Sequence, residues 1–113
     1  MLLWYPIAMA YFGDTRNLTR GLRKKQQYLL NYPDLLFAAA AYNGNQSYIE
    51  KLHEFGLSYP LSLIIQYAIL NDQLELYQNS VLKTNLYTDK EFTRNFLNSA
   101  CLAGSYKIVN YIL

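Results

Sequence analysis

The chain has 113 residues, of which 52% are hydrophobic and 16% charged, and this balance excludes an intrinsically disordered polypeptide. Its net charge of +2 excludes a strongly acidic or strongly basic protein. A single cysteine, Cys101, excludes an internal disulfide and favours a reducing, cytoplasmic setting, and one cysteine with one histidine falls short of the usual zinc ligands.

The chain begins with an apolar stretch, "MLLWYPIAMAYF" (residues 1–12). Twelve residues are too few to span a bilayer, and the stretch lacks both a positively charged leader and a small-residue cleavage pattern. The next apolar run, "LLFAAAAY" (35–42), is shorter still. We therefore predict neither a signal peptide nor a transmembrane helix.

Basic residues gather soon after this stretch. Arg20 lies four residues after Arg16, three before Arg23 and four before Lys24, so most of these side chains share one face of a predicted helix. They are candidates for an anion-binding surface that would contact nucleic acid, acidic lipid or an acidic protein. The alternative is a solvated outer face. No aromatic residues alternate with the cluster as they do on platforms that stack nucleic-acid bases.

A short phrase recurs along the whole chain. A turn residue follows small or apolar residues at Gly13, Gly44, Asp72 and Gly104, with separations of 31, 28 and 32 residues. The residues three before these turn residues are Ala10, Ala41, Ile69 and Cys101, those four before are Met9, Ala40, Ala68 and Ala100, and those five after are Leu18, Ile49, Tyr77 and Val109. Small residues let helices approach closely, and Gly or Asp tolerates the left-handed turn that ends a helix.

Each phrase thus predicts an antiparallel pair of short helices, in four units spanning approximately 1–30, 31–58, 59–87 and 88–113 of one domain, 1–113. One such pair cannot bury its own apolar faces, so the pairs are expected to stack side by side. Predicted helix starts are Pro33 with Asp34, Pro60 with Ser62, and a capping box of Thr88 with Glu91. Gly56 is the predicted end of the second helix of unit two.

These phrases resemble ankyrin repeats. The best match is "LNSACLAGSYKIVNYIL" (97–113), followed by "LFAAAAYNGNQSYIEKLHEFGL" (36–57) and "IIQYAILNDQLELYQNSVL" (64–82). The first unit departs most, with a basic second helix that contains Gly21. The family's Thr-Pro-Leu-His opening is absent, and only residues 57–59 separate Gly56 from Pro60, so the β-hairpin fingers are expected to be reduced or missing. Small-residue helix pairs also occur in tetratricopeptide-like arrays.

The resemblance implies an all-α, ankyrin-like solenoid of about four repeats. It also implies a non-catalytic protein–protein interaction module, a scaffold or adaptor without a cofactor, of the kind found in larger proteins and in pathogen effectors that act in host cytoplasm. Two other functions stay open. The chain is either a docking or regulatory domain of a larger enzyme, or an anionic-surface or nucleic-acid binder through its basic first repeat.

A column of residues two before each turn residue offers candidate partner contacts. Tyr11 and Tyr42 occupy this column, and Leu70 and Leu102 complete it. Tyrosine combines a large contact area with a polar tip, so these rings could anchor a partner, and packing between units is the alternative. The next column adds three further candidate partner-binding residues, which are Phe12, Asn43 and Asn71.

Candidate catalytic groups are sparse. His53 has no nucleophile or orienting group beside it in the sequence, so we expect a surface or half-buried helix residue rather than a general base. Cys101 belongs to a column of small residues, which predicts a small buried side chain rather than a reactive thiolate. No catalytic or metal-binding residue is predicted. The apolar ending, Tyr111 to Leu113, is open to three interpretations: a module cut from a longer chain, self-association through terminal repeats, or a last helix that packs backwards.

Overall fold

A computed structural model of the chain describes residues 10–13, 33–54, 56–58, 60–84 and 89–113. These residues are mainly helical and contain no strand, which confirms the prediction of an all-α fold for this part of the chain. Residues 10–12 are helical. The helices with defined bounds are α4 (Pro33–Tyr42), α5 (Gln46–Glu54), α6 (Leu61–Leu70), α7 (Leu74–Leu82), α8 (Lys90–Ala103) and α9 (Tyr106–Ile112). None of them is long and apolar enough to cross a membrane.

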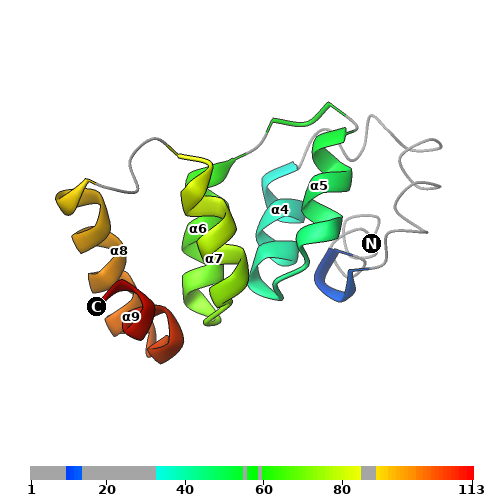
Figure 1. The fold of residues 1–113 in the computed structure, drawn as a ribbon. Helices are drawn as coiled ribbons and strands as arrows, with labels where there is room; N and C mark the ends of the chain where they lie inside the picture. Colours follow the sequence, from blue (N-terminus) through cyan, green and yellow to red (C-terminus); the bar gives the residue numbers. More distant parts are fainter. Residues whose placement is uncertain (1–9, 14–32, 55, 59, 85–88) are drawn as a thin grey trace.

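The helices form three hairpins, α4–α5, α6–α7 and α8–α9, that lie side by side in chain order (Figure 1). They belong to the second, third and fourth predicted units and are called the second, third and fourth hairpins. Helix α6 packs against α4 on one side and α8 on the other, while α7 contacts α9. The tight turns within the hairpins all lie along one edge, the lower edge in Figure 1. The molecule is elongated, with extents of 45 × 25 × 20 Å.

The four predicted turn residues all adopt the left-handed conformation. Gly13, Gly44 and Gly104 have φ values of 72°, 68° and 74°, and Asp72 has a φ of 53°. The backbone closes each complete turn in the same way. The N–H of the residue after the turn residue donates to a carbonyl five positions back, at distances of 2.8–2.9 Å for Asn45, Gln73 and Ser105. This closure satisfies carbonyls that the end of a helix would otherwise leave unpaired.

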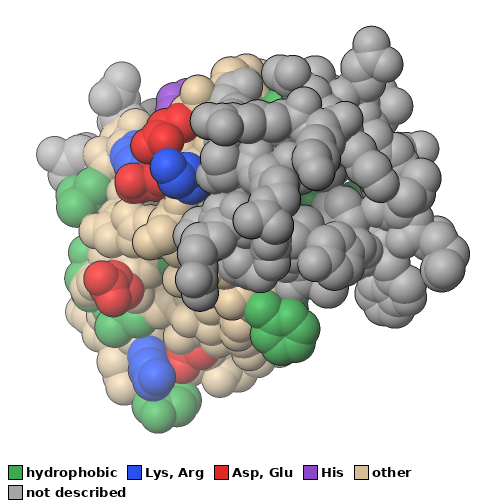
Figure 2. All heavy atoms as spheres, turned by 90° about the vertical axis from the view of Figure 1, so that its right-hand side faces the viewer, with side chains coloured by type: hydrophobic (Ala, Val, Ile, Leu, Met, Phe, Trp, Pro, Cys, Tyr) green, Lys and Arg blue, Asp and Glu red, His purple; other side chains and the backbone are tan. Residues whose placement is uncertain are grey.

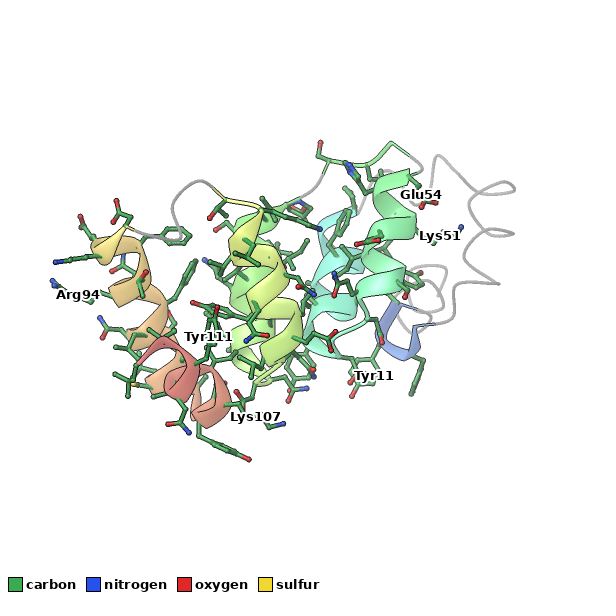
Figure 3. The ribbon with its side chains drawn as sticks, viewed as in Figure 1. Tyr11, Lys51, Glu54, Arg94, Lys107 and Tyr111 are labelled. Atoms are coloured by element: carbon green, nitrogen blue, oxygen red, sulfur yellow. The ribbon has the colours of Figure 1, made fainter. Side chains whose placement is uncertain are left out.

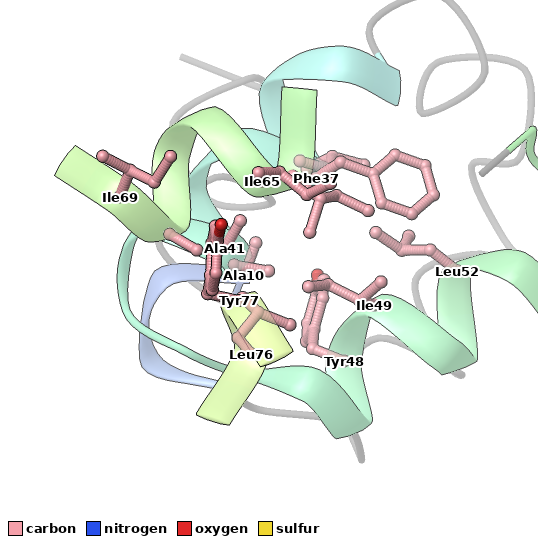
Figure 4. Close-up of a cluster of buried hydrophobic side chains, with 14 of the residues drawn as sticks. Ala10, Phe37, Ala41, Tyr48, Ile49, Leu52, Ile65, Ile69, Leu76 and Tyr77 are labelled. Atoms are coloured by element: carbon pink, nitrogen blue, oxygen red, sulfur yellow. The ribbon is translucent and has the colours of Figure 1, made fainter. Parts of the chain in front are cut away.

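The core fills the space between neighbouring hairpins (Figure 4). Ala40, Ala68 and Ala100 are fully buried, and their small size allows the close packing of α4, α6 and α8. Larger side chains from α4, α5, α6 and α9 complete the core, among them Phe37, Tyr48, Ile49, Leu52, Ile64, Ile65, Ile69 and Ile108. Burying each such aliphatic or aromatic side chain stabilises the fold by about 1.5–3 kcal/mol. Neighbouring hairpins therefore share one core, and no hairpin encloses a core of its own.

The predicted helix starts hold in two cases and need correction in the third. Helix α4 begins at Pro33 and α6 begins at Leu61, directly after Pro60, as expected. The capping residue of α8 is Asp89, whose side chain accepts a hydrogen bond of 3.0 Å from the N–H of Phe92. The predicted capping box of Thr88 with Glu91 is therefore wrong in register, because the Asp89 carboxylate already caps the first turn. Thr88 lies outside the described residues.

A second correction concerns Cys101. The repeat pattern predicts a buried side chain there, and the side chain is exposed. Its counterparts Ala10, Ala41 and Ile69 are all buried, and a described hairpin follows each of them in the chain. No described residue covers the side of α8 that carries Cys101, so the side chain at this position of the repeat is exposed.

Candidate interaction surface

The side chains on the turn edge form an exposed apolar strip. We call it the turn strip. Phe12 is 76% exposed, Leu102 91%, and Tyr11 and Tyr42 are each 38% exposed. Figure 3 shows Tyr11 at this lower edge of the molecule. The turn strip comprises Tyr11, Phe12, Tyr42, Leu70 and Leu102. The sequence column of predicted partner contacts therefore lies on one edge, and each of its four members is exposed.

The three aromatic rings of the turn strip lie against one another. The rings of Tyr11 and Tyr42 are stacked, with centroids 6.4 Å apart and planes 26° apart. Phe12 meets the ring of Tyr11 edge-on, with centroids 5.1 Å apart. Aromatic pairs in such arrangements contribute about 0.5–1.5 kcal/mol beyond their buried area. Tyr11 and Tyr42 thus pack against each other between units and remain partly exposed, so a role in partner contact stays a prediction.

Side-chain amides hold the turns in register. The Asn43 Nδ2 donates to the Tyr11 carbonyl at 2.7 Å, and the Asn71 Nδ2 donates to the Tyr42 carbonyl at 2.9 Å. The residue after each turn residue adds a second donor to the same carbonyls, from Asn45 at 2.6 Å and from Gln73 at 3.2 Å. Asn43 and Asn71 therefore lie beside the turn strip, and their amide groups bond to the preceding hairpin.

Sequence reasoning missed the role of the position after the turn residue. This position carries Asn45, Gln73 and Ser105, and the Ser105 hydroxyl donates to the Ile69 carbonyl. All three side chains thus bond to a carbonyl near the end of the helix that leads into the previous turn residue. The signal was present, because the column is polar in every unit, Asp14 included.

Two glycines of the turns have no room for a side chain. A Cβ atom added at Gly44 would lie 2.5 Å from the Gln73 Oε1, and one added at Gly13 would lie 2.9 Å from the Asn45 Oδ1. Glycine is therefore needed there both for its positive φ and for the close approach of the next hairpin.

Asp72 replaces glycine in the third unit and gains a second role. Its two carboxylate oxygens accept hydrogen bonds from the N–H groups of Lys107 and Ile108, at 3.2 and 3.1 Å. These groups belong to the first turn of α9, which has no intrahelical partners for them. Asp72 thus ends α6 and caps a helix in the next hairpin.

A shallow polar groove of about 330 Å³ opens beside Phe12, along the starts of α5 and α7. Its lining includes Gln46, Ser47, Gln73 and Glu75, so donors and acceptors lie next to the aromatic end of the turn strip. Figure 2, which views the side of the row where residues 10–13 lie, shows acidic and basic side chains close together among the described residues, without a large area of one sign. The surface can supply apolar area and hydrogen bonds to a partner.

The predicted anion-binding residues Arg16, Arg20, Arg23 and Lys24 lie outside the described residues. His53 is exposed on α5, with its Nδ1 3.2 Å from the Leu57 carbonyl oxygen. A cavity of about 540 Å³ beside it is lined, among the described residues, by Glu50, His53, Glu54, Leu61 and Lys83. Within the described ranges, no group of three or more His, Cys, Asp or Glu side chains could hold a metal.

Burial raises the pKa of the Tyr77 hydroxyl to about 12, with a smaller contribution from the nearby Tyr111. The Tyr77 ring meets Phe96 of α8 and Tyr111 of α9 edge-on, at centroid distances of 6.0 and 6.1 Å. A phenol that stays protonated to this pH cannot serve as a base near neutrality. Tyr77 is therefore a packing residue between the third and fourth hairpins.

No family model matches the chain, and neither a curated protein nor a solved structure matches it.

Proposed function

We propose that the chain is a non-catalytic protein-interaction module, built as an ankyrin-like helical solenoid of about four repeats with reduced β-hairpin fingers. The supporting geometry is the repeated junction. At each of three successive junctions, the polar side chain after the turn residue donates to a backbone carbonyl. That carbonyl lies near the end of the helix that leads into the previous turn residue. Arrays of this kind use an extended surface to bind a partner. The single exposed thiol suits a cytoplasmic location.

The partner binds along the turn strip. The observation that carries this proposal is that the strip is both exposed and held in place. The carbonyls of Tyr11 and Tyr42 each accept two side-chain amides, so the backbone that carries the rings is fixed before binding. Fixed aromatic anchors lose little conformational freedom on association, and tyrosine and tryptophan are frequent hot spots. The partner presents an apolar surface to the rings and polar groups to the adjoining groove.

The test is capture of partners from a candidate cellular lysate by the immobilised chain. The double variant Tyr11→Ala, Tyr42→Ala is expected to lose at least tenfold in captured partner. The matched control is Leu82→Ala, because Leu82 is 62% exposed and ends α7, at the opposite end of the hairpins from the turns. Equal capture by the double variant and the wild type would contradict the proposal.

A second measurement locates the contact directly. A photoreactive benzophenone side chain introduced at Phe12 is expected to crosslink the captured partner, and the same group introduced at Leu82 is expected to leave it uncrosslinked. The reverse pattern would place the partner on the other edge of the molecule.

A further inference from the structure

The turn between α4 and α5 contains Asn43 followed by Gly44, the single Asn–Gly pair in the sequence. Because glycine carries no side chain, its backbone nitrogen is the least shielded nucleophile that can follow an asparagine. When the backbone rotates suitably, this nitrogen reaches the carbonyl carbon of the asparagine side chain and closes a five-membered ring. The pair is therefore reactive in the presence of water alone.

The reaction is deamidation, and its atoms balance with water as the only co-reactant. The Gly44 nitrogen attacks the Asn43 Cγ, the bond between Cγ and Nδ2 breaks, and the proton of the Gly44 N–H leaves with Nδ2 as ammonia. Water then opens the resulting cyclic imide at either of its carbonyls. One opening leaves aspartate at position 43, and the other leaves isoaspartate, in which the main chain runs through the former side chain.

The fold holds both reacting groups in hydrogen bonds. The Asn43 Nδ2 donates to the Tyr11 carbonyl at 2.7 Å, and the Gly44 N–H donates to the Ala41 carbonyl at 3.1 Å. Ring closure breaks both bonds, because it expels Nδ2 and removes the Gly44 proton. Proteins open locally at a lower free energy than global unfolding requires, and exposed hydrogen bonds open most readily. The pair therefore reacts when this part of the structure opens.

Separation of residues 10–12 from the second hairpin frees the Asn43 amide. The Asn45 side chain opposes this separation, because its Nδ2 lies 2.9 Å from the Ala10 carbonyl oxygen and 2.6 Å from the Tyr11 carbonyl oxygen. Three side-chain hydrogen bonds from two asparagines thus keep the junction closed. The rate of deamidation should accordingly depend on how often this junction opens.

Either product weakens the junction permanently. A carboxylate at position 43 has no donor for the Tyr11 carbonyl, and it places one acceptor opposite another. Isoaspartate also lengthens the main chain between α4 and α5 by one carbon atom. The Asn45 N–H closes this turn by donating to the Ala40 carbonyl at 2.8 Å, so a longer main chain displaces the Asn45 side chain as well.

We propose that Asn43 is a self-modification site, at which deamidation through Gly44 fixes this junction in its open state. Opening precedes the reaction, and the product lacks the amide that closes the junction. The rings of Tyr11 and Tyr42 are stacked across the same junction, so the reaction separates the two tyrosines of the turn strip. The modification is a property of the junction and does not depend on the binding of a partner.

The first test follows conversion of Asn43 by peptide mass spectrometry while the purified chain is incubated at pH 8. The reference is a synthetic peptide of residues 40–46, in which no neighbouring segment holds the pair. We expect conversion at least tenfold slower in the chain than in the peptide. Conversion at Asn43 should still be faster than at Asn98, an exposed asparagine of α8 that a serine follows.

The variant Asn45→Ala tests the dependence on opening. It removes two of the three side-chain bonds that hold residues 10–12, so conversion of Asn43 should be at least threefold faster in this variant chain. The same substitution in the peptide should leave the rate unchanged, which separates opening from an effect of local sequence. The matched control is Asn98→Ala, which removes an asparagine from the fourth hairpin and should not alter the conversion of Asn43.

The open state has a readout of its own. Chymotrypsin cleaves after aromatic residues, so Tyr11 and Phe12 become substrates when residues 10–12 leave the second hairpin. Ion exchange separates the converted chain by its added negative charge. Cleavage after Tyr11 or Phe12 should be at least fivefold faster in the converted chain and in Asn43→Asp than in the unconverted chain. Cleavage after Tyr106, which is exposed on α9, should be unchanged.

Three results would overturn the proposal. One is equal conversion in the chain and in the peptide, since the folded junction would then not control the reaction. Another is conversion at Asn43 no faster than at Asn98 in the chain. The third is equal cleavage after Tyr11 and Phe12 in the converted and unconverted chains. Partner capture by the turn strip is measured separately, and its failure would leave these results unaffected.

Discussion

Among the described glycines, Gly44 leaves the least room for a side chain beside the next hairpin. Its φ of 68° is unfavourable for residues with a side chain, and a Cβ atom there would lie 2.5 Å from the Gln73 Oε1. Gly104 has a similar φ of 74° but an open surrounding. The two glycines therefore separate the cost of the dihedral angle from the cost of the close approach.

We expect Gly104→Ala to lower the free energy of unfolding by about 1–2 kcal/mol through the dihedral angle alone. Gly44→Ala should lower it further, by about 1 kcal/mol more, because Gln73 must move and its bond to the Tyr42 carbonyl weakens. Urea unfolding followed by circular dichroism measures both. Equal losses would show that Gln73 gives way without cost.

Substitution of Asp72 tests whether a side chain of one hairpin can cap a helix of the next hairpin. Asp72→Gly keeps the left-handed turn and removes both acceptors from the first turn of α9, so we expect a loss of about 1 kcal/mol in unfolding free energy. Hydrogen exchange gives the specific readout, since the N–H groups of Lys107 and Ile108 should exchange faster. Asp72→Asn, which keeps one acceptor oxygen, should fall between the wild type and the glycine variant.

At the scale of single residues, the sequence is informative where the constraint is local. The left-handed turn needs Gly or a residue that tolerates it, so Gly13, Gly44, Asp72 and Gly104 are found by inspection. The partners of Asn45 and Gln73 are 31–35 residues away, and no local pattern names them. The cap of α8 was misplaced because Asp89 and the adjacent Thr88 are both good capping residues.

The spacing of apolar residues along a helix predicts which face of the helix is apolar. Tyr48, Ile49 and Leu52 are spaced as one face of a helix, and all three are fully buried. Ile108 is likewise buried, but Val109 and Ile112 are only half-buried. Periodicity identifies the apolar face of a helix, whereas the neighbouring hairpin determines how much of that face is covered, as the exposed Cys101 demonstrates.

Tyr77 links α7 to α8 and α9 and makes their packing sensitive to high pH. Its folded-state pKa is about 12, against 10.0 for an ordinary tyrosine. Below pH 10 the hydroxyl is protonated in both states, so this part of the stability is fully present. Between pH 10 and 12 the unfolded chain loses the proton first, so the free energy of unfolding falls, by up to about 1.4 kcal/mol per pH unit.

The matched variant is Tyr77→Phe, which keeps the ring and removes the titrating group. Urea unfolding at pH 8 and at pH 11 should show a smaller loss for Tyr77→Phe than for the wild type. The comparison cancels the other tyrosines, which titrate in both proteins. An identical loss in the two proteins would mean that the Tyr77 hydroxyl reaches water in the folded state.

The described hairpins form a row in which the main contacts join neighbouring hairpins. Helix α6 contacts α4 and α8, and the hydrogen bonds between units join adjacent hairpins. In such an array, stability is approximately a sum of unit terms and nearest-neighbour junction terms. Weakening one junction should therefore loosen the hairpin beyond it and leave distant hairpins unchanged, unlike a defect in a single compact core.

Ser105→Ala tests this local loosening at the junction of the third and fourth hairpins. The Ser105 hydroxyl is buried and donates to the Ile69 carbonyl, which also accepts the Asp72 N–H at 3.3 Å, so its removal loses one buried hydrogen bond at a cost of about 0.5–1.5 kcal/mol. Hydrogen exchange should accelerate at least fivefold in α8 and α9 and remain unchanged in α4 and α5. The control is Ser99→Ala, because the exposed Ser99 hydroxyl bonds only within its own helix, to the Asn95 carbonyl at 3.1 Å. Equal acceleration in all the helices would mean that the row unfolds as one cooperative unit, and the junctions would then not be separable in energy.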